Sequence, residues 1–249
     1  MELFFCSQIE TDNFFLDEEE SHHLFKVMRH AVGDELMVTD GKGKLIRAKI
    51  TQEHKKNCVL QIIELVKQEP QPTPTIHVAI APTKNSDRFE WFLEKATEIG
   101  VTEITPIICQ RSERNKIKHE RLRKILIGSM KQSLQLWLPN LNAMVPFKNF
   151  FTHSLPRSIG DSQLAPINRG LTTHAFICHC QSENLSSLQS LYNRGENALI
   201  MIGPEGDFTP EEIQLAEASG FSAVTLGQNR LRTETAGMVA VHTVQLLNS

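Results

Sequence analysis

The stretch ALIMIGPEGDFTPEE, residues 198–212, decides the fold class of this 249-residue chain. Its apolar start favours a short buried strand, and the glycine-bearing GPEGD after it favours a tight turn. Thr209, Pro210 and Glu212 then indicate a helix start through a threonine N-cap, a proline in the first turn and a capping-box glutamate. Strand, glycine loop and helix in this order predict an α/β fold that binds ligands beyond the carboxyl ends of its strands.

Strand and helix patterns alternate around this stretch. Short apolar runs predict further strands, at 76–81, 104–109, 175–178 and 223–226. Helices are indicated by apolar or small residues at helical spacing, in the sets Phe89/Phe92/Leu93/Ala96, Leu122/Ile125/Leu126/Ser129 and Ala236/Val239/Ala240/Val244/Leu247. Gly100 is expected to end the first of these helices. The stretch 151–173, rich in Ser, Pro, Gly and Asn, is expected to be a loop.

Three prolines at alternate positions, Pro70, Pro72 and Pro74, favour a stiff extended linker. We therefore predict two domains, residues 1–70 and residues 71–249. The smaller part carries three strand patterns and one helix pattern, at 35–39, 45–50, 58–63 and 18–29. This content predicts a compact β-barrel, a common format for RNA-binding modules.

Composition excludes several classes of protein. With 40% hydrophobic and 22% charged residues, the chain has ordinary globular composition. The net charge of −3 excludes a protein that is basic overall, but a local basic patch stays open. The five cysteines form no CxxC pair, which is typical of reduced thiols in a cytoplasmic protein. No apolar stretch approaches the roughly 20 residues of a membrane span, so we expect no membrane partner.

Other binding motifs are absent or weak. No GxGxxG follows a strand, and no Walker GxxxxGK[ST] occurs. His22 and His23 are adjacent, so on a helix their side chains point in different directions. Cys178 and Cys180 share one face of a strand, but two thiols do not complete a zinc site. We therefore predict no metal.

A second glycine-bearing loop strengthens the interpretation of the first as part of a binding site. The stretch LGQNRLRTETA, residues 226–236, follows the next predicted strand and again carries a glycine, Gly227. Taken alone, GPEG is more consistent with a plain turn than with a binding loop. Two such loops at the ends of consecutive strands could line one pocket, because glycines let the backbone approach a ligand closely.

Together these motifs resemble the RsmE family of SPOUT methyltransferases, which form N3-methyluridine in small-subunit ribosomal RNA. The resemblance covers nearly the full chain. Its motifs are His23, Val27, Arg29, Gly33, Asp34, Asp40 and Gly41 before the linker, then Lys84, Asp87-Arg88, KATEIG at 95–100 and Arg111-Ser112, and finally the two glycine loops.

The resemblance implies a PUA-like N-terminal domain and a SPOUT domain with a deep C-terminal trefoil knot. It also implies a homodimer that methylates 16S ribosomal RNA of the small subunit with S-adenosylmethionine (SAM). The implied cofactor-binding residues are Ile202, Gly203, Pro204, Glu205, Gly206, Leu226, Gly227, Leu231, Arg232 and Thr233. The implied catalytic residues are Arg232 and Glu234. The implied RNA contacts are Arg29, Lys84, Arg88, Arg111 and Arg114.

Alternatives and departures stay open. Arg232 and Glu234 could instead form a structural ion pair, and Glu205 could act only as a carboxylate at a helix N-terminus. Asp207 stands where the family usually has a second glycine, and Gln135 stands where it often has an arginine. The Gln135 departure either weakens a role of that helix in gripping RNA or moves that role to Lys131. The rival functions are a non-catalytic RNA-binding ribosome assembly factor and a SPOUT methyltransferase acting on another RNA site.

Overall fold

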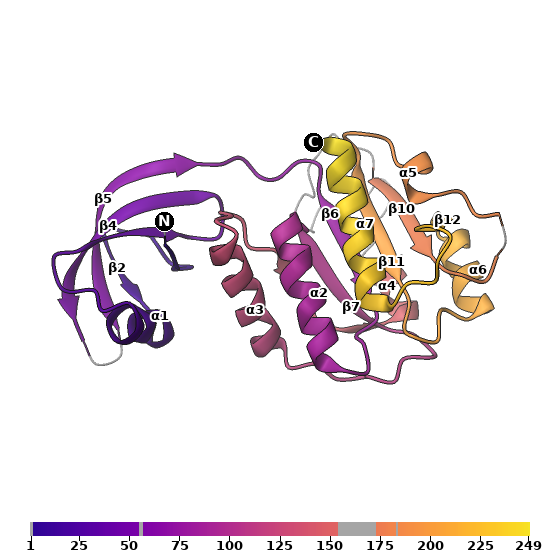
Figure 1. Cartoon of the computed structure of the whole chain (residues 1–249), viewed down its shortest axis with the longest axis horizontal. Helices are drawn as coiled ribbons and strands as arrows, with labels where there is room; N and C mark the ends of the chain where they lie inside the picture. Colours follow the sequence, from indigo (N-terminus) through magenta and orange to yellow (C-terminus); the bar gives the residue numbers. More distant parts are fainter. Residues whose placement is uncertain (1, 55–56, 154–172, 183) are drawn as a thin grey trace. The chain divides into compact units, whose positions relative to one another are not determined.

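The computed structural model describes residues 2–54, 57–153, 173–182 and 184–249 (Figure 1). The chain falls into two compact units. The first contains Met1–Pro72 and Leu126–Leu138, and the second contains Thr73–Ile125 and Pro139–Ser249. The sequence division assigned 126–138 to the second part, whereas the structure joins it to the first.

The first unit is built on a five-stranded sheet of order β1-β3-β4-β5-β2. Its strands are β1 (Leu3–Phe5), β2 (Asn13–Leu16), β3 (Glu35–Thr39), β4 (Lys44–Glu53) and β5 (Cys58–Gln68). β1 and β3 are parallel, and the remaining neighbours are antiparallel. Alternate residues of these strands bury one face against a core that includes Leu16, Val38 and Leu60, as the period of two in a strand requires.

The predicted helix over 18–29 is present but shorter and irregular. α1 (Glu18–His22) starts at the N-cap Asp17, and a π-helical turn, His23–Val27, continues it. The last part of α3 (His119–Gln132) also belongs to this unit. There Lys131 Nζ lies 2.5 Å from Glu20 Oε1 and 5.6 Å from the centroid of the Phe4 ring. The ammonium of Lys131 therefore makes its contacts with residues of the first unit.

The second unit contains a parallel sheet of order β12-β10-β11-β6-β7-β8, with β9 also paired to β7. Its strands are β6 (Ile76–Ile80), β7 (Glu103–Ile108), β8 (Asn140–Leu141), β9 (Val145–Pro146), β10 (Thr173–Cys178), β11 (Asn197–Ile202) and β12 (Ser222–Val224). Every pairing is parallel, which confirms the predicted α/β class. All residues of β11 are buried, as expected for a central strand.

Among the described residues, five helices connect strands of this sheet and a sixth follows its last strand. The connecting helices are α2 (Ser86–Ile99), α3, α4 (Phe147–His153), α5 (Leu188–Leu191) and α6 (Pro210–Ala218), and the last is α7 (Thr233–Asn248). Gly100 ends α2 in the left-handed conformation with φ 112°, as predicted. The capping box that starts α6 is also confirmed, with Thr209 as N-cap and Glu212 as its partner.

α7 packs closely against α2, beside which it lies in Figure 1. A Cβ built on Gly237 would lie 2.6 Å from the ring of Phe92. This close approach centres the buried face of α7 on Gly237, Ala240 and Val244, whereas the predicted Val239 and Leu247 are only half-buried.

The predicted loop over 151–173 is only partly testable. Phe151 lies in α4 and Thr173 starts β10, while 154–172 lie outside the described residues. The trefoil knot stays a prediction, because strand order alone does not define how the chain threads. Within the described ranges, no helix combines the length and apolar character needed to cross a membrane.

Candidate functional site

A cavity of about 740 Å³ opens where β10, β11 and β12 end, in the second unit. Cavities of this size hold cofactors and other small molecules. The loop after β11 and the segment from Val224 to Thr233 form two of its walls. The cavity therefore lies at the carboxyl edge of a parallel sheet, where α/β proteins bind their ligands.

All but one of the residues predicted to bind the cofactor line this cavity. They are Ile202, Gly203, Pro204, Glu205, Leu226, Gly227, Leu231, Arg232 and Thr233. The exception is Gly206, whose carbonyl accepts a hydrogen bond of 2.8 Å from Arg111 Nη1. Thr233 Oγ1 donates to the carbonyl of Gly203 at 3.0 Å, which joins the two predicted loops directly.

Sequence reasoning missed the third wall of the cavity. It follows β10 and includes Cys178, His179 and Cys180, of which only the two cysteines had been considered from the sequence, as metal ligands. The strand ending at Cys178 was predicted, so the rule about carboxyl ends could have been applied to it. What the sequence did not provide was the strand order, in which β10 lies directly between β11 and β12.

Two glutamates after β11 hold loops that follow other strands. Glu205 Oε1 accepts a hydrogen bond of 2.8 Å from the backbone N–H of Lys84, in the segment after β6. Glu212 Oε1 accepts one of 2.8 Å from the N–H of Gln110, in the segment after β7. Both carboxylates thus satisfy loop donors that no strand partner satisfies. Glu205 therefore fixes the segment after β6, a role beyond that of a carboxylate near a helix N-terminus.

Asp207 makes the corresponding tie to the third wall. Its backbone has φ 63°, in the left-handed region that glycine favours and that aspartate tolerates better than most residues. Its Oδ2 accepts a hydrogen bond of 3.0 Å from the N–H of Cys180, and its Oδ1 accepts one of 2.8 Å from the N–H of Phe208. The departure from the family's glycine therefore keeps the backbone conformation and adds a link between two walls.

Burial keeps the titratable groups of the third wall neutral. It raises the pKa of the Cys178 thiol, and it raises the pKa of Cys180, to which the nearby Asp207 carboxylate adds. Desolvation lowers the pKa of His179, whose Nε2 is buried without a hydrogen-bond partner in the part of the chain that the structure describes. At neutral pH this wall therefore carries two thiols and a neutral imidazole. No metal-binding group of three or more His, Cys, Asp or Glu residues occurs among the described residues.

The two predicted catalytic residues occupy different environments. Arg232 is exposed, lines the cavity and stands at the N-cap of α7. Glu234 is buried, and its Oε1 lies 3.8 Å from Nε of Arg88. Its Oε2 is buried and has no hydrogen-bond partner among the described residues. The ion pair of Glu234 is therefore made with Arg88 of α2, whereas the sequence alternative paired it with Arg232.

The remaining predicted RNA contacts are divided between the units. Arg29 lies in the first unit and is exposed, with φ 61°. Lys84 is paired with Glu113 at 2.7 Å. Arg114 donates to the carbonyls of Thr83 and Lys84 at 2.9 and 2.6 Å. Arg111 and Arg114 therefore help to hold the loops around the cavity.

A parallel α/β unit with this cavity, following a small β-rich unit, is the architecture that the resemblance implies for an α/β methyltransferase of the SPOUT class with an N-terminal PUA domain. The sequence comparisons agree with this class. Residues 69–245 match the family described as RNA methyltransferase domain, and residues 16–63 match the RNA methyltransferase PUA domain. The chain belongs to this RNA methyltransferase family.

Similar proteins extend over most of the chain. The ribosomal RNA small subunit methyltransferase E of Synechocystis is 30% identical, over 93% of this chain and 72% of the relative. A probable rRNA-methyltransferase from Porphyromonas gingivalis has a similar structure, with a TM-score of 0.84, 35% identity and coverage of 100% and 98%. The ribosomal RNA small subunit methyltransferase E of Neisseria gonorrhoeae, bound to S-adenosyl methionine, has a TM-score of 0.81, 25% identity and the same coverage.

Proposed function

We propose that this chain uses SAM to methylate N3 of a specific uridine in 16S ribosomal RNA of the small ribosomal subunit, in the cytoplasm. The observation that carries the proposal is the cavity at the carboxyl edge of the parallel sheet, lined by two glycine loops and a third wall. Its family membership and the SAM-bound Neisseria relative support the choice of cofactor.

The cavity suits SAM chemically. Ile202, Leu226 and Leu231 provide apolar contacts for an adenosyl group, while Glu205 and Asp207 provide carboxylates near a ligand with cationic groups. A Cβ on Gly227 would meet nothing within 4 Å, so the backbone at this position faces open space. When bound, SAM supplies a methyl group activated by its sulfonium.

The chain's own residues must then handle the proton on uracil N3. Arg232 lies at the cavity and can polarise a uracil carbonyl through its guanidinium, which stabilises the developing anion. Glu234 follows the lining residue Thr233 but lies outside the cavity wall, where its Oε1 is 3.8 Å from Nε of Arg88, so it can orient this segment without touching the N3 proton. We therefore propose Arg232 and Glu234 as the catalytic pair, with Arg232 at the substrate and Glu234 as a positioning residue behind it.

Cofactor binding separates this proposal from a non-catalytic RNA-binding assembly factor. Isothermal titration calorimetry with SAM, in the presence and absence of small-subunit ribosomal RNA, is the direct measurement. Saturable binding is expected. No heat of binding under either condition would exclude the methyltransferase.

The methylated position is tested separately. The chain is expressed in a bacterial strain whose small-subunit ribosomal RNA lacks N3-methyluridine, and the nucleosides of that RNA are measured by mass spectrometry. We expect N3-methyluridine to return. Appearance of a ribose methylation, or of a methyl group in another RNA, would instead support the alternative SPOUT activity.

Variants test the catalytic pair. Arg232→Ala and Glu234→Gln are each expected to lower kcat by about 100-fold, which is the lower range for loss of charge stabilisation in the transition state. Glu234 does not line the cavity, so Glu234→Gln should leave the SAM dissociation constant within about twofold. Lys148→Ala, an exposed change in α4, is the control. A wild-type kcat for Glu234→Gln would remove that residue from the mechanism.

We also propose a homodimer. Support comes from the family resemblance and from two large exposed leucines, Leu191 of α5 and Leu246 of α7, on helices that contact each other. Sedimentation equilibrium should give twice the chain mass of 28.2 kDa. A monomer at micromolar concentration would contradict the dimer.

A further inference from the structure

A second cavity, of about 500 Å³, lies in the second unit. Its walls come from the start of α2, the segment that precedes α3 and the first turn of α3. Four cationic side chains line it, those of Arg114, Lys116, Lys118 and Arg121. Neither the two glycine loops nor the proposed catalytic pair contributes to this cavity.

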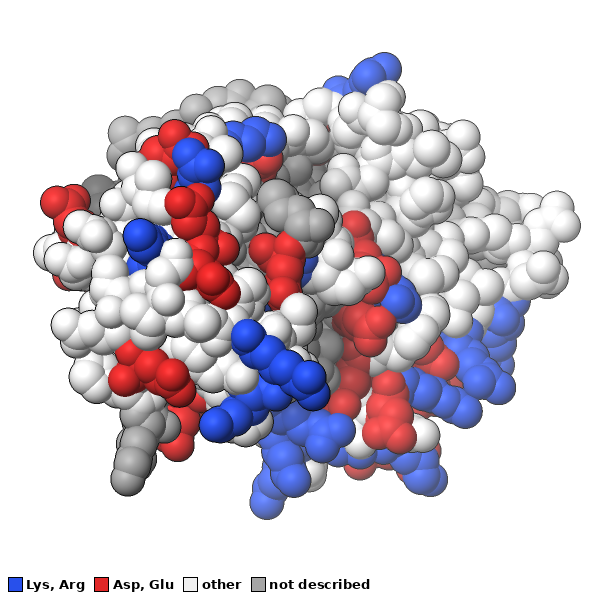
Figure 2. Space-filling view, turned by 60° about the vertical axis from the view of Figure 1, so that its left-hand side comes forward, with Lys and Arg blue, Asp and Glu red and all other residues white. Residues whose placement is uncertain are grey.

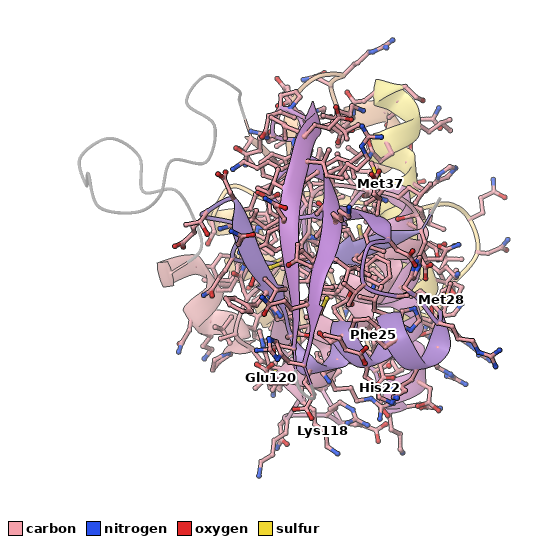
Figure 3. All side chains as sticks on the ribbon, turned by 90° about the vertical axis from the view of Figure 1, so that its left-hand side faces the viewer. His22, Phe25, Met28, Met37, Lys118 and Glu120 are labelled. Carbon is pink, nitrogen blue, oxygen red and sulfur yellow. The ribbon has the colours of Figure 1, made fainter. Side chains whose placement is uncertain are left out.

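The charge of this cavity runs against that of the whole chain. The chain has a net charge of −3, yet the single acidic residue of the cavity, Glu90, is paired with Arg121 at 2.7 Å. Lys116 and Lys118 are exposed and form no ion pair within the described ranges. Figure 2 shows Lys and Arg side chains along the lower part of the view with Asp and Glu side chains among them, and Figure 3 labels Lys118. The cavity therefore presents unneutralised positive charge suited to a phosphate.

The cavity also has an apolar side. Phe89, Ile117 and Leu122 line it beside the lysines. Phe89 and Leu122 are buried in the unit, and Ile117 is half-buried. A lone inorganic anion would use only the cations. A nucleotide uses both sides, because its phosphate pairs with cations while its sugar and base cover apolar surface.

One short segment connects this cavity with the cofactor cavity. Arg114 lines the second cavity and donates to the carbonyls of Thr83 and Lys84. The N–H of Lys84 in turn donates to Glu205, which lines the first cavity. Ser86, two residues further on, lines the second cavity again. The two cavities thus share the segment 83–86 as a common support.

We infer that the second cavity binds a nucleotide of single-stranded RNA, on the same RNA segment as the uridine that reaches the cofactor cavity. The inference rests on the proposed function. A base that must leave its stack to react requires locally single-stranded RNA, and Lys116 and Lys118 hold the phosphate of a flanking nucleotide.

The double variant Lys116→Ala/Lys118→Ala tests this inference in the full chain with SAM bound. Affinity for the small-subunit ribosomal RNA substrate is measured between 50 and 200 mM salt. We expect affinity to fall about tenfold at low salt, and the slope of log affinity against log salt to flatten by about 0.7, the value for one lost single-strand phosphate contact. The SAM dissociation constant should stay within about twofold. Unchanged RNA affinity and salt slope would overturn the inference.

Lys148→Ala is the matched control, since it removes an exposed lysine of the same unit outside both cavities. It should change affinity less than twofold. If the wild-type chain neither binds SAM nor methylates RNA, the proposed function fails whatever the lysines do. If the wild type methylates RNA and the double variant has the same KM for RNA, only the present inference fails.

A chemical footprint separates RNA from a simple anion. The rate of acetylation of Lys116 and Lys118 is measured by mass spectrometry with a single-stranded oligouridylate, uridine monophosphate or inorganic phosphate at equal concentration. We expect several-fold protection by the oligonucleotide, weaker protection by the mononucleotide and none by phosphate, with Lys148 unaffected. Equal protection by inorganic phosphate would identify an anion site without specificity for nucleotides and would overturn the inference.

Discussion

Asp207 shows how one residue can keep a backbone conformation and add a function to it. A glycine would adopt φ 63° without cost, whereas aspartate accepts a small penalty there. Its carboxylate accepts a hydrogen bond from the backbone N–H of Cys180, in the third wall of the cofactor cavity. The sequence identified Asp207 as a departure from its family, but the partner of its carboxylate depends on strand order and became visible only in the fold.

The variant Asp207→Gly separates the backbone from the carboxylate. Glycine fits the left-handed conformation, so the fold should persist, but the tie between two cavity walls is lost. A hydrogen bond to a charged group contributes about 1.5 kcal/mol, so we expect SAM affinity to fall about tenfold, measured by calorimetry. Because the Asp207 carboxylate raises the pKa of Cys180, its removal should lower that pKa and speed alkylation of the thiol by iodoacetamide at pH 8.

Asp207→Asn is the conservative control. Asparagine also tolerates the left-handed region and keeps an acceptor oxygen, so SAM affinity should recover to within about threefold of the wild type. Alkylation of Cys180 should be as fast in this variant as in Asp207→Gly and faster than in the wild type, because the negative charge is absent. Wild-type SAM affinity in Asp207→Gly would show that the tie has no role in cofactor binding.

Two helical glycines give opposite expectations for the same substitution. Gly237 of α7 has no room for a Cβ, which would lie 2.6 Å from Phe92 and 2.9 Å from Ile80. Gly128 of α3 has no atom within 4 Å of the corresponding position. Gly237→Ala should therefore destabilise the fold by about 1–3 kcal/mol through overpacking, whereas Gly128→Ala should stabilise it by up to about 1 kcal/mol through helix propensity.

Urea denaturation of the two variants measures both changes, with each variant serving as the control of the other. If alanine stabilised both helices, helix propensity alone would decide the outcome, and the close packing of α7 on α2 would be disproved. If it destabilised both, Gly128 would have a packing role that its surroundings do not indicate.

Features that depend on neighbouring residues were predictable at the scale of elements. The capping box of Thr209 and Glu212 and the end of α2 at Gly100 follow from side chains and backbone preferences within a few positions, and the structure contains both. The buried face of α7 was predicted less well, because it is centred on Gly237, whose role comes from the distant ring of Phe92. Glu212 also accepts a hydrogen bond from the backbone N–H of Gln110. The two residues are 102 positions apart in the sequence, so no local pattern indicates this contact.

At the scale of the whole molecule, the contacts that the sequence does not predict are those set by strand order. β10 lies between β11 and β12, so residues around Cys180 meet loops that follow them by more than twenty positions. The same long-range assembly buries ionisable side chains. His77 lies on β6 within the parallel sheet, where its Nε2 is 2.7 Å from Thr105 Oγ1. Desolvation lowers the pKa of His77, as it does for His179.

These two histidines predict how stability depends on pH. In the unfolded chain a histidine takes up a proton near pH 6.5, while the folded chain keeps His77 and His179 neutral to lower pH. The unfolded state therefore binds more protons, and the free energy of unfolding should fall as pH decreases below about 6.5, by at most about 1.4 kcal/mol per pH unit for each histidine. Above about pH 7.5 their contribution should be constant, because they are neutral in both states.

Urea denaturation at pH 7.5 and pH 5.5 measures this effect in the wild type and in His77→Gln. Glutamine removes one titrating group, so the loss of stability between the two pH values should be smaller in this variant, even if its stability at pH 7.5 is lower. His54→Gln, a change at an exposed histidine, should retain the wild-type pH dependence. A loss of stability that is equal in His77→Gln and the wild type would show that His77 does not resist protonation in the folded chain.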